Sequence, residues 1–174
     1  QASVRRVWPD MLVIGIEEHQ PLGIWGESRL INTFGELFVA SIGEAEKDGP
    51  LPMLSGPEGS ERLVMHRYED MRRWLADLGR TPETVTLSAR HAWTVRLDDE
   101  TTLVLGRDQG VPIEDRVKRW ATVFPRVQEQ LDRKAEVIDL RYPSGFAIRS
   151  VKLLAAEGDS AKAPGSVSVA KLNR

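Results

Sequence analysis

Apolar and polar residues alternate in several short stretches of the chain, which is the pattern of β-strands that bury one face. The clearest stretch near the N-terminus covers residues 11–18, where Leu12, Ile14 and Ile16 occupy every second position. Shorter stretches of the same kind predict strands at residues 24–25, 30–32, 36–38, 85–87, 92–97 and 102–105. Tight turns join neighbouring strands, so we expect mainly antiparallel pairing.

A change of the period from two to about 3.6 marks the clearest helix. Its apolar residues follow one another at helical spacings, at Val64, Tyr68, Met71, Leu75 and Leu78. These positions share one helix face, which we expect to pack against the sheet. Ser60 is a suitable N-cap for this helix, and Gly79 is suited to end it.

A second helix is predicted from about residue 113 onward. Its apolar face consists of Ile113, Val117, Ala121 and Phe124. Pro125 has no N–H group to donate, so we expect it either to break this helix or to kink it, in which case Val127 and Leu131 continue the helix. Residues 41–49, in contrast, are small and polar and are expected to form a surface loop.

Near the C-terminus the period returns to two and predicts a β-hairpin over residues 137–149. Ile138, Leu140 and Tyr142 occupy every second position, and Pro143 and Gly145 are suited to the turn that follows. Residues 155–174 are rich in Ala, Gly, Ser, Lys and Pro, so we expect a flexible tail there. The hairpin is then the last element, with its final strand at a sheet edge to which a partner chain can add a strand.

Together these elements predict an α+β fold, a mainly antiparallel sheet of short strands with two packed helices, ending in a C-terminal β-hairpin. The chain has 174 residues, enough for one domain and a fragment of a second, and 41% of its residues are hydrophobic. Of its five tryptophans, Trp8 lies in a turn and is the one we expect to be exposed.

Composition excludes several classes of function. The net charge of −2 gives no general reason to expect nucleic acid as a partner. The absence of cysteine excludes disulfides, Cys-ligated metals and thiol catalysis. No apolar run reaches the roughly 20 residues that span a bilayer. The chain begins at Gln1 rather than Met, so we expect a processed or excised piece whose targeting segment has been removed.

The residues capable of chemistry form no recognisable catalytic or metal-binding pattern. His19, His66 and His91 are far apart and have no partner at ligand spacing. The glycine-rich residues 56–60 open a helix, but they contain a glutamate and no Gly-Lys-Ser/Thr sequence, so a turn with a helix cap is the better interpretation. The acidic residues 98–100 suit a hairpin turn. We therefore expect no catalytic residues, no metal and no cofactor.

Several segments in this order resemble the periplasmic region of the bacterial FtsQ family of cell-division proteins. The resemblance is carried by residues 4–10 (VRRVWPD) with 17–25 (EEHQPLGIW), 54–60 (LSGPEGS), 87–93 (LSARHAW), 105–107 (LGR) and 139–147 (DLRYPSGFA). It covers roughly residues 4–149. It implies a non-enzymatic scaffold of the divisome.

The resemblance also implies a domain organisation and a location. Proteins of this family have a short cytoplasmic tail, one inner-membrane helix, a POTRA domain and a C-terminal β-domain. Residues 1–20 would then be the remnant of the POTRA domain with its last strand, residues 21–154 the β-domain, and residues 155–174 the tail. The chain would be the periplasmic part of a protein that is anchored in the inner membrane at the division septum.

By the same resemblance, the partners are FtsB and FtsL, together with other divisome proteins. A short FtsB segment would add a β-strand to the terminal strand of the β-domain, at Arg90, Arg141, Tyr142, Ser144 and Gly145. Arg90 would pair with an acidic residue of FtsB. Some family members have a tryptophan near the end of the last strand, where this chain has Ser150. Phe146 or Ile148 would supply the apolar contact instead, or belong to the core.

Two other functions fit the pattern less well. One is a different POTRA-bearing envelope assembly factor that binds polypeptides by strand addition. The other is a hydrolase that uses the scattered carboxylates or histidines.

Overall fold

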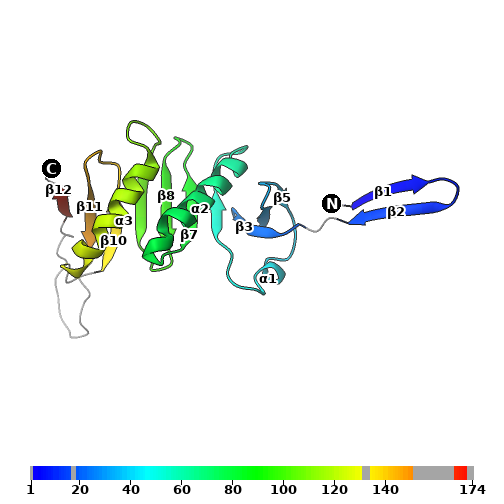
Figure 1. Cartoon of the computed structure of the whole chain (residues 1–174), viewed down its shortest axis with the longest axis horizontal. Helices are drawn as coiled ribbons and strands as arrows, with labels where there is room; N and C mark the ends of the chain where they lie inside the picture. The colour runs from blue at the N-terminus through cyan, green and yellow to red at the C-terminus, as the bar shows by residue number, and fades with distance from the viewer. Residues whose placement is uncertain (1, 17–18, 131–133, 151–166, 172–174) are drawn as a thin grey trace.

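A computed structural model describes residues 2–16, 19–130, 134–150 and 167–171. Ten strands form one sheet in the order β12-β11-β10-β9-β8-β7-β6-β3-β4-β5 (Figure 1). Their bounds are β3 Pro21–Trp25, β4 Arg29–Asn32, β5 Leu37–Phe38, β6 Met53–Ser55, β7 Pro82–Leu87, β8 Trp93–Leu97, β9 Thr102–Gly106, β10 Ala135–Asp139, β11 Gly145–Ser150 and β12 Val167–Lys171. The pairs β3/β6, β6/β7 and β9/β10 are parallel, and the others are antiparallel. The predicted α+β class with a mainly antiparallel sheet is thus confirmed.

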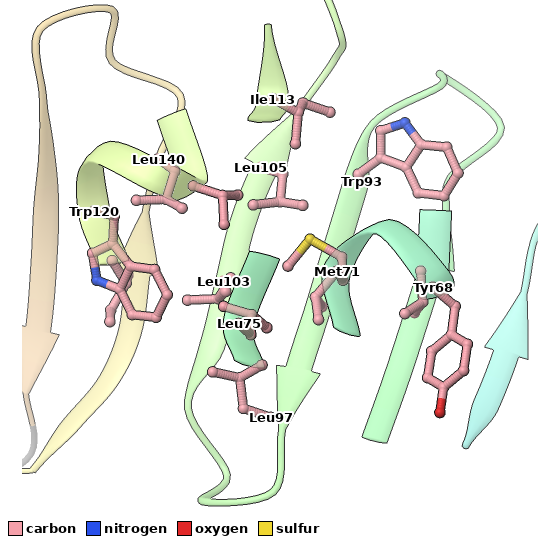
Figure 2. Close-up of a cluster of buried hydrophobic side chains, with 14 of the residues drawn as sticks. Tyr68, Met71, Leu75, Trp93, Leu97, Leu103, Leu105, Ile113, Trp120 and Leu140 are labelled. Atoms are coloured by element: carbon pink, nitrogen blue, oxygen red, sulfur yellow. The ribbon is translucent and has the colours of Figure 1, made fainter. Parts of the chain in front are cut away.

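Two long helices, α2 (Glu61–Leu75) and α3 (Ile113–Glu129), cover one face of the sheet (Figure 1). The predicted face of α2 is buried, and the predicted C-cap Gly79 has the left-handed conformation, after a short 3-10 turn at Ala76–Leu78. Figure 2 shows the side chains of both helices meeting those of β8 and β9 in one core. Its fully buried members include Met71, Leu75, Leu103 and Trp120.

The opposite face of the sheet is polar. Along β8, Trp93, Val95 and Leu97 are buried, while Thr94 and Arg96 between them are not. Side chains on this face interact with one another across strands, as in the hydrogen bond of 3.1 Å from Ser55 Oγ to Thr86 Oγ1. The fold is therefore a two-layer sandwich with its helices on one side.

A separate β-hairpin, formed by β1 (Ala2–Val7) and β2 (Met11–Ile16), extends away from the sheet (Figure 1). The strand predicted over residues 11–18 is present as β2. Residues 17–18 of the predicted range lie outside the described residues. Its partner β1 was not predicted, because its residues show no regular alternation. Trp8, in the turn, is 85% exposed as expected.

One local prediction needs correction, and an alternative left open at Pro125 is decided. A helix of one turn, α1 (Ile42–Ala45), lies within the expected surface loop 41–49, because the hydroxyl of Ser41 accepts a hydrogen bond from the amide of Glu44. Pro125 lies inside α3, which continues to Glu129, so a break at Pro125 is excluded and the continuation of the helix through Val127 is confirmed. Leu131 lies outside the described residues. Phe124 is buried and Val127 packs against the core, and this burial offsets the missing hydrogen bond. None of the helices in the described part of the chain is long and apolar enough to cross a membrane.

The prediction that the hairpin is the last element is wrong. Residues 167–171 form β12, which pairs antiparallel with β11 at the end of the sheet. Within the predicted tail 155–174 this strand contains Val167 and Val169, whose β-branched side chains favour extended backbone. The small residues around them concealed that signal. Residues 155–166 and 172–174 lie outside the described residues.

Two leucines of α2 provide a test of the packing. Leu75 is fully buried, whereas Leu63 is 48% exposed. Leu75→Ala is expected to lower the free energy of unfolding by about 2–5 kcal/mol, because it leaves a cavity under the sheet, and Leu63→Ala by less than about 1 kcal/mol. Urea denaturation followed by tryptophan fluorescence measures both values. Equal losses for the two variants would contradict this position of α2.

Candidate functional site

Three connections meet at one end of the sheet. They are the turn between β7 and β8, the loop between β9 and α3, and the turn between β10 and β11. Arg107 Nε in the second donates a hydrogen bond of 3.0 Å to the carbonyl of Arg90 in the first. Gly106, at the start of the second, lies against the side chain of Arg141 in the third. Arg90 and Arg141, which are distant in sequence, are therefore brought to the same end of the fold.

Gly106 is required at this junction for two reasons. Its φ is +68°, a left-handed conformation that glycine adopts without strain. A Cβ atom at this position would also lie only 2.8 Å from Cγ of Arg141. Glycine thus lets the chain leave β9 and lets the Arg141 side chain lie across its backbone.

The buried side chain of Arg116, on α3, holds this end of the sheet together. Its Nη1 donates to the carbonyls of Leu105 and Leu140, at 2.6 and 3.1 Å, and its Nη2 donates to the carbonyl of Arg107 at 2.9 Å. One turn further along α3, Arg119 Nη1 donates to the carbonyl of Pro143. Burial lowers the pKa of Arg116, and the nearby Asp108 opposes that shift. Helix α3 therefore fixes the backbone from which the β10–β11 turn projects.

Asp108, close to the Arg116 guanidinium, connects the two helices. Its carboxylate accepts hydrogen bonds from the amide of Ile113 at 3.1 Å and from Arg67 Nη2 at 2.8 Å. The Arg67 guanidinium also lies over the rings of Trp74 and Trp93. Burial raises the pKa of Asp108, but these hydrogen bonds and cations outweigh burial, so the pKa lies below its ordinary value. The start of α3 is thereby fixed against α2.

Four residues expected at the partner contact are on the surface of this end of the sheet. Arg90, Arg141, Tyr142 and Ser144 are exposed, and Tyr142 is 48% exposed. Gly145 is partly buried, at the start of β11. The structure thus places these five residues at one end of the sheet, four of them at the turn into β11 and Arg90 in the turn between β7 and β8.

The two arginines differ in their partners. Arg141 binds the carboxylate of Asp139 in the same strand end, with hydrogen bonds of 2.9 and 3.1 Å from Nε and 2.6 Å from Nη2. Burial raises the pKa of Asp139, but the hydrogen bonds with Arg141 and its positive charge lower it by more, so the pKa lies below its ordinary value. Among the described residues, no hydrogen bond or ion pair involves the guanidinium of Arg90. Arg90 is therefore the cation better placed to bind an acidic partner.

Phe146 and Ile148 take a different position from the exposed residues. They are 1% and 3% exposed and belong to the core under α3. Ser150, where an aromatic residue was considered, is 9% exposed. The side chains of Phe146 and Ile148 face the domain interior, so the outer edge of β11 consists of backbone groups. On the side away from β10 those groups pair with β12.

The remaining polar candidates do not gather into a reactive site. His19 Nδ1 lies 2.9 Å from Asn32 Nδ2, and His66 pairs with Glu69 on the surface of α2. Asp99 accepts a hydrogen bond from the amide of Thr101 and pairs with Arg80. In the described ranges, no three His, Cys, Asp or Glu residues are arranged to hold a metal ion.

Arg116 and Asp108 are the structural residues that the sequence analysis missed. A signal for Arg116 was present, because Ile113, Arg116, Val117 and Trp120 share one helix face. An arginine on the buried face of a helix must find carbonyl or carboxylate partners. The identity of those partners depends on tertiary structure.

Comparison with known proteins gives a consistent result. Residues 23–141 match the family model described as cell division protein FtsQ/DivIB, C-terminal. The chain is similar to the cell division protein FtsQ of Burkholderia pseudomallei, with 47% identity over 86% of this chain and 59% of that protein. It is 41% identical to that of Bordetella pertussis, over 84% of the chain and 59% of that protein. For Escherichia coli K12 the identity is 33%, over 85% and 53%. The chain thus spans about three fifths or less of the length of these relatives.

The pair between Asp139 and Arg141 predicts a contribution to acid stability. Because the folded-state pKa of Asp139 is lowered, its stabilisation is present above the unfolded pKa of about 4 and is lost as the pH falls through the folded value. Asp139→Asn is expected to lower the free energy of unfolding at pH 7 by about 1 kcal/mol or less, since Arg141 is largely exposed.

Urea denaturation at several pH values between 2 and 7 measures this effect. The free energy of unfolding of the unchanged chain should fall more steeply below about pH 4 than that of the Asp139→Asn variant. Glu44→Gln, at an exposed position on α1, is the control and should leave the slope as it is. Parallel curves for all three proteins would exclude this contribution of Asp139.

Proposed function

The chain belongs to the FtsQ/DivIB family of cell-division proteins, and we propose that it is a non-enzymatic scaffold that binds its partner by β-strand addition at β11. The observation that carries this proposal is that Arg90, Arg141 and Tyr142 lie at the same end of the sheet, where Arg107 contacts Arg90 and Gly106 contacts Arg141. This end of the sheet then presents an exposed cation and an exposed aromatic ring beside the start of β11. A strand edge supplies affinity through backbone hydrogen bonds, and the neighbouring side chains supply specificity.

The chemistry of this region favours a partner strand with an acidic residue. Arg90 projects from the turn between β7 and β8, and Arg107 holds its backbone in place. An arginine presents a planar fork of donors that matches a carboxylate. Tyr142 offers an apolar ring with a polar end, as do many residues at protein interfaces. The core side chains of Phe146 and Ile148 keep β11 in position, and its backbone binds the partner.

We further propose the partners and the location that the family resemblance implies. The added strand comes from FtsB, with FtsL and other divisome proteins in the same assembly. The site lies on the periplasmic side of the inner membrane, at the division septum, in a protein anchored by a membrane helix outside this chain. Residues 1–20 are the end of a POTRA domain and residues 21–154 the β-domain, to whose sheet β12 adds a strand. The family match over residues 23–141 favours this division role over that of another POTRA-bearing assembly factor.

Charge reversal at Arg90 tests the proposed contact. Arg90→Glu is expected to weaken binding of an FtsB C-terminal peptide by about 2 kcal/mol, roughly thirtyfold, if the ion pair is buried on binding. Tyr142→Ala should also weaken binding, through the loss of ring contact. Isothermal titration calorimetry with the peptide measures both. Arg126→Glu, an exposed residue near the other end of α3, is the matched control for net charge and should bind normally.

Arg141→Ala is expected to have a smaller effect on binding than Arg90→Ala. The guanidinium of Arg141 is already bound by Asp139, so its pairing with a partner carboxylate gains less. The same calorimetric titration compares the two variants. Unchanged peptide binding by both Arg90→Glu and Tyr142→Ala would disprove this site.

A further inference from the structure

The strand that completes the sheet, β12, lies on the edge of β11 that the proposed function assigns to a partner. The pairing is antiparallel, with Gly145 opposite Lys171 and Arg149 opposite Val167. It covers five of the six residues of β11, from Gly145 to Arg149. The other edge of β11 is paired with β10. Figure 1 shows β12 as the outermost strand at this end of the sheet.

A strand has only two edges for backbone pairing. Along an antiparallel pair, the N–H and C=O groups of alternate residues point to one neighbour, and those of the residues between them point to the other. With β10 on one side and β12 on the other, both sets in β11 are engaged. A partner strand and β12 therefore cannot pair with β11 at the same time.

We propose that β12 is an internal competitor of the partner, and that the partner binds β11 by displacing it. This inference rests on the proposed strand addition at β11. The two strands belong to one chain, so β12 is present at the edge at an effective concentration on the order of millimolar, whatever the concentration of protein. Only molecules in which β12 has left β11 can bind a free partner. The measured affinity is therefore the intrinsic affinity multiplied by the fraction of such molecules.

The sequence of β12 is suited to a strand that can be displaced. It is short, Val-Ser-Val-Ala-Lys, and only its two valines are strong β-formers. Ala170 and Lys171 belong to residue types that are depleted in strands. It lies at the end of the sheet, so its removal breaks pairing with one neighbour only and leaves the order from β11 to β5 intact. The core side chains of β11 face α3, and β10 still holds that strand.

The test uses the full chain with Ser168→Pro and Val169→Pro together. Of two adjacent residues, one directs its N–H toward β11, so the double substitution removes a pairing donor whichever residue provides it. Ser168→Ala with Val169→Ala is the control, because both N–H groups remain. Hydrogen exchange measured by mass spectrometry should show faster exchange in Gly145–Ser150 of the proline variant, with β8 and β9 still protected. Unchanged exchange in β11 would overturn the proposal, because β12 would then not protect it.

Two fluorescent peptides separate this inference from the proposed function. The first is the chain's own segment 164–174, and the second is an FtsB C-terminal peptide. Fluorescence anisotropy should show that each peptide binds the proline variant at least about tenfold more tightly than it binds the intact chain or the alanine control.

The possible failures differ for the two ideas. One outcome is that the chain's own peptide binds the proline variant while the FtsB peptide binds none of the proteins. That outcome supports the coverage of the β11 edge by β12 and shows that the proposed partner is wrong. If the FtsB peptide binds the intact chain and the proline variant equally, strand addition does not require displacement and the competition is disproved. If the FtsB peptide binds the proline variant more weakly than the intact chain, the partner adds to β12 instead, which also overturns the inference.

Discussion

The guanidinium of Arg116 joins three carbonyl groups from two strand ends and a loop, and the arrangement of the proposed contact region depends on it. Leu105 is near the end of β9, Leu140 follows β10, and Arg107 belongs to the loop that contacts Arg90. Each of these carbonyls lies beyond or at the end of regular pairing and would otherwise need water or another donor. One rigid, permanently charged group satisfies all three. Helix α3 therefore helps to position both Arg90 and the β10–β11 turn, although neither is adjacent to it in the sequence.

The burial of this cation has a cost, and the structure shows how it is offset. Arg116 is 6% exposed, and its Nε has no hydrogen-bond partner among the described residues. Removing a charge from water is unfavourable unless hydrogen bonds and opposite charge replace the solvent. The three carbonyl dipoles and the nearby Asp108 provide that replacement. Asp108 is itself fixed by Ile113 and Arg67, so the site is supported by one polar network that runs from α2 through α3 to the sheet end.

Local sequence patterns predicted the parts of the fold that local physics decides. The spacing of Val64, Tyr68 and Met71 identified α2 because helix faces repeat within a few residues. The hairpin before β11 was predicted for a similar reason, and Pro143 lies in its turn, whereas Gly145 is already the first residue of β11 and is not left-handed. The partners of Arg116 and the position of β12 were not predicted, because both depend on contacts between distant segments. The proximity of Arg90 to Arg141 came only from the family resemblance, since no pattern within either segment indicates it.

The outer edge of β11 shows how a strand edge can be protected by another strand of the same chain. An exposed edge is a risk, because any extended chain can pair with it. Phe146 and Ile148 fix β11 to the core through side chains, while β12 contacts it through backbone pairing along the free edge. These two kinds of interaction are independent: exchange of the outer strand changes the backbone partner without moving the core. In the proposed competition, a partner strand has to bind β11 more favourably than the short strand β12 does. Because both strands would form similar backbone hydrogen bonds, side-chain contacts outside the sheet would decide which one binds. Tyr142 directly precedes β11, and Arg90 lies in the β7–β8 turn at the same end of the sheet. Neither residue belongs to a strand, so a partner that also reaches these side chains would be favoured over β12 without a change in the sheet.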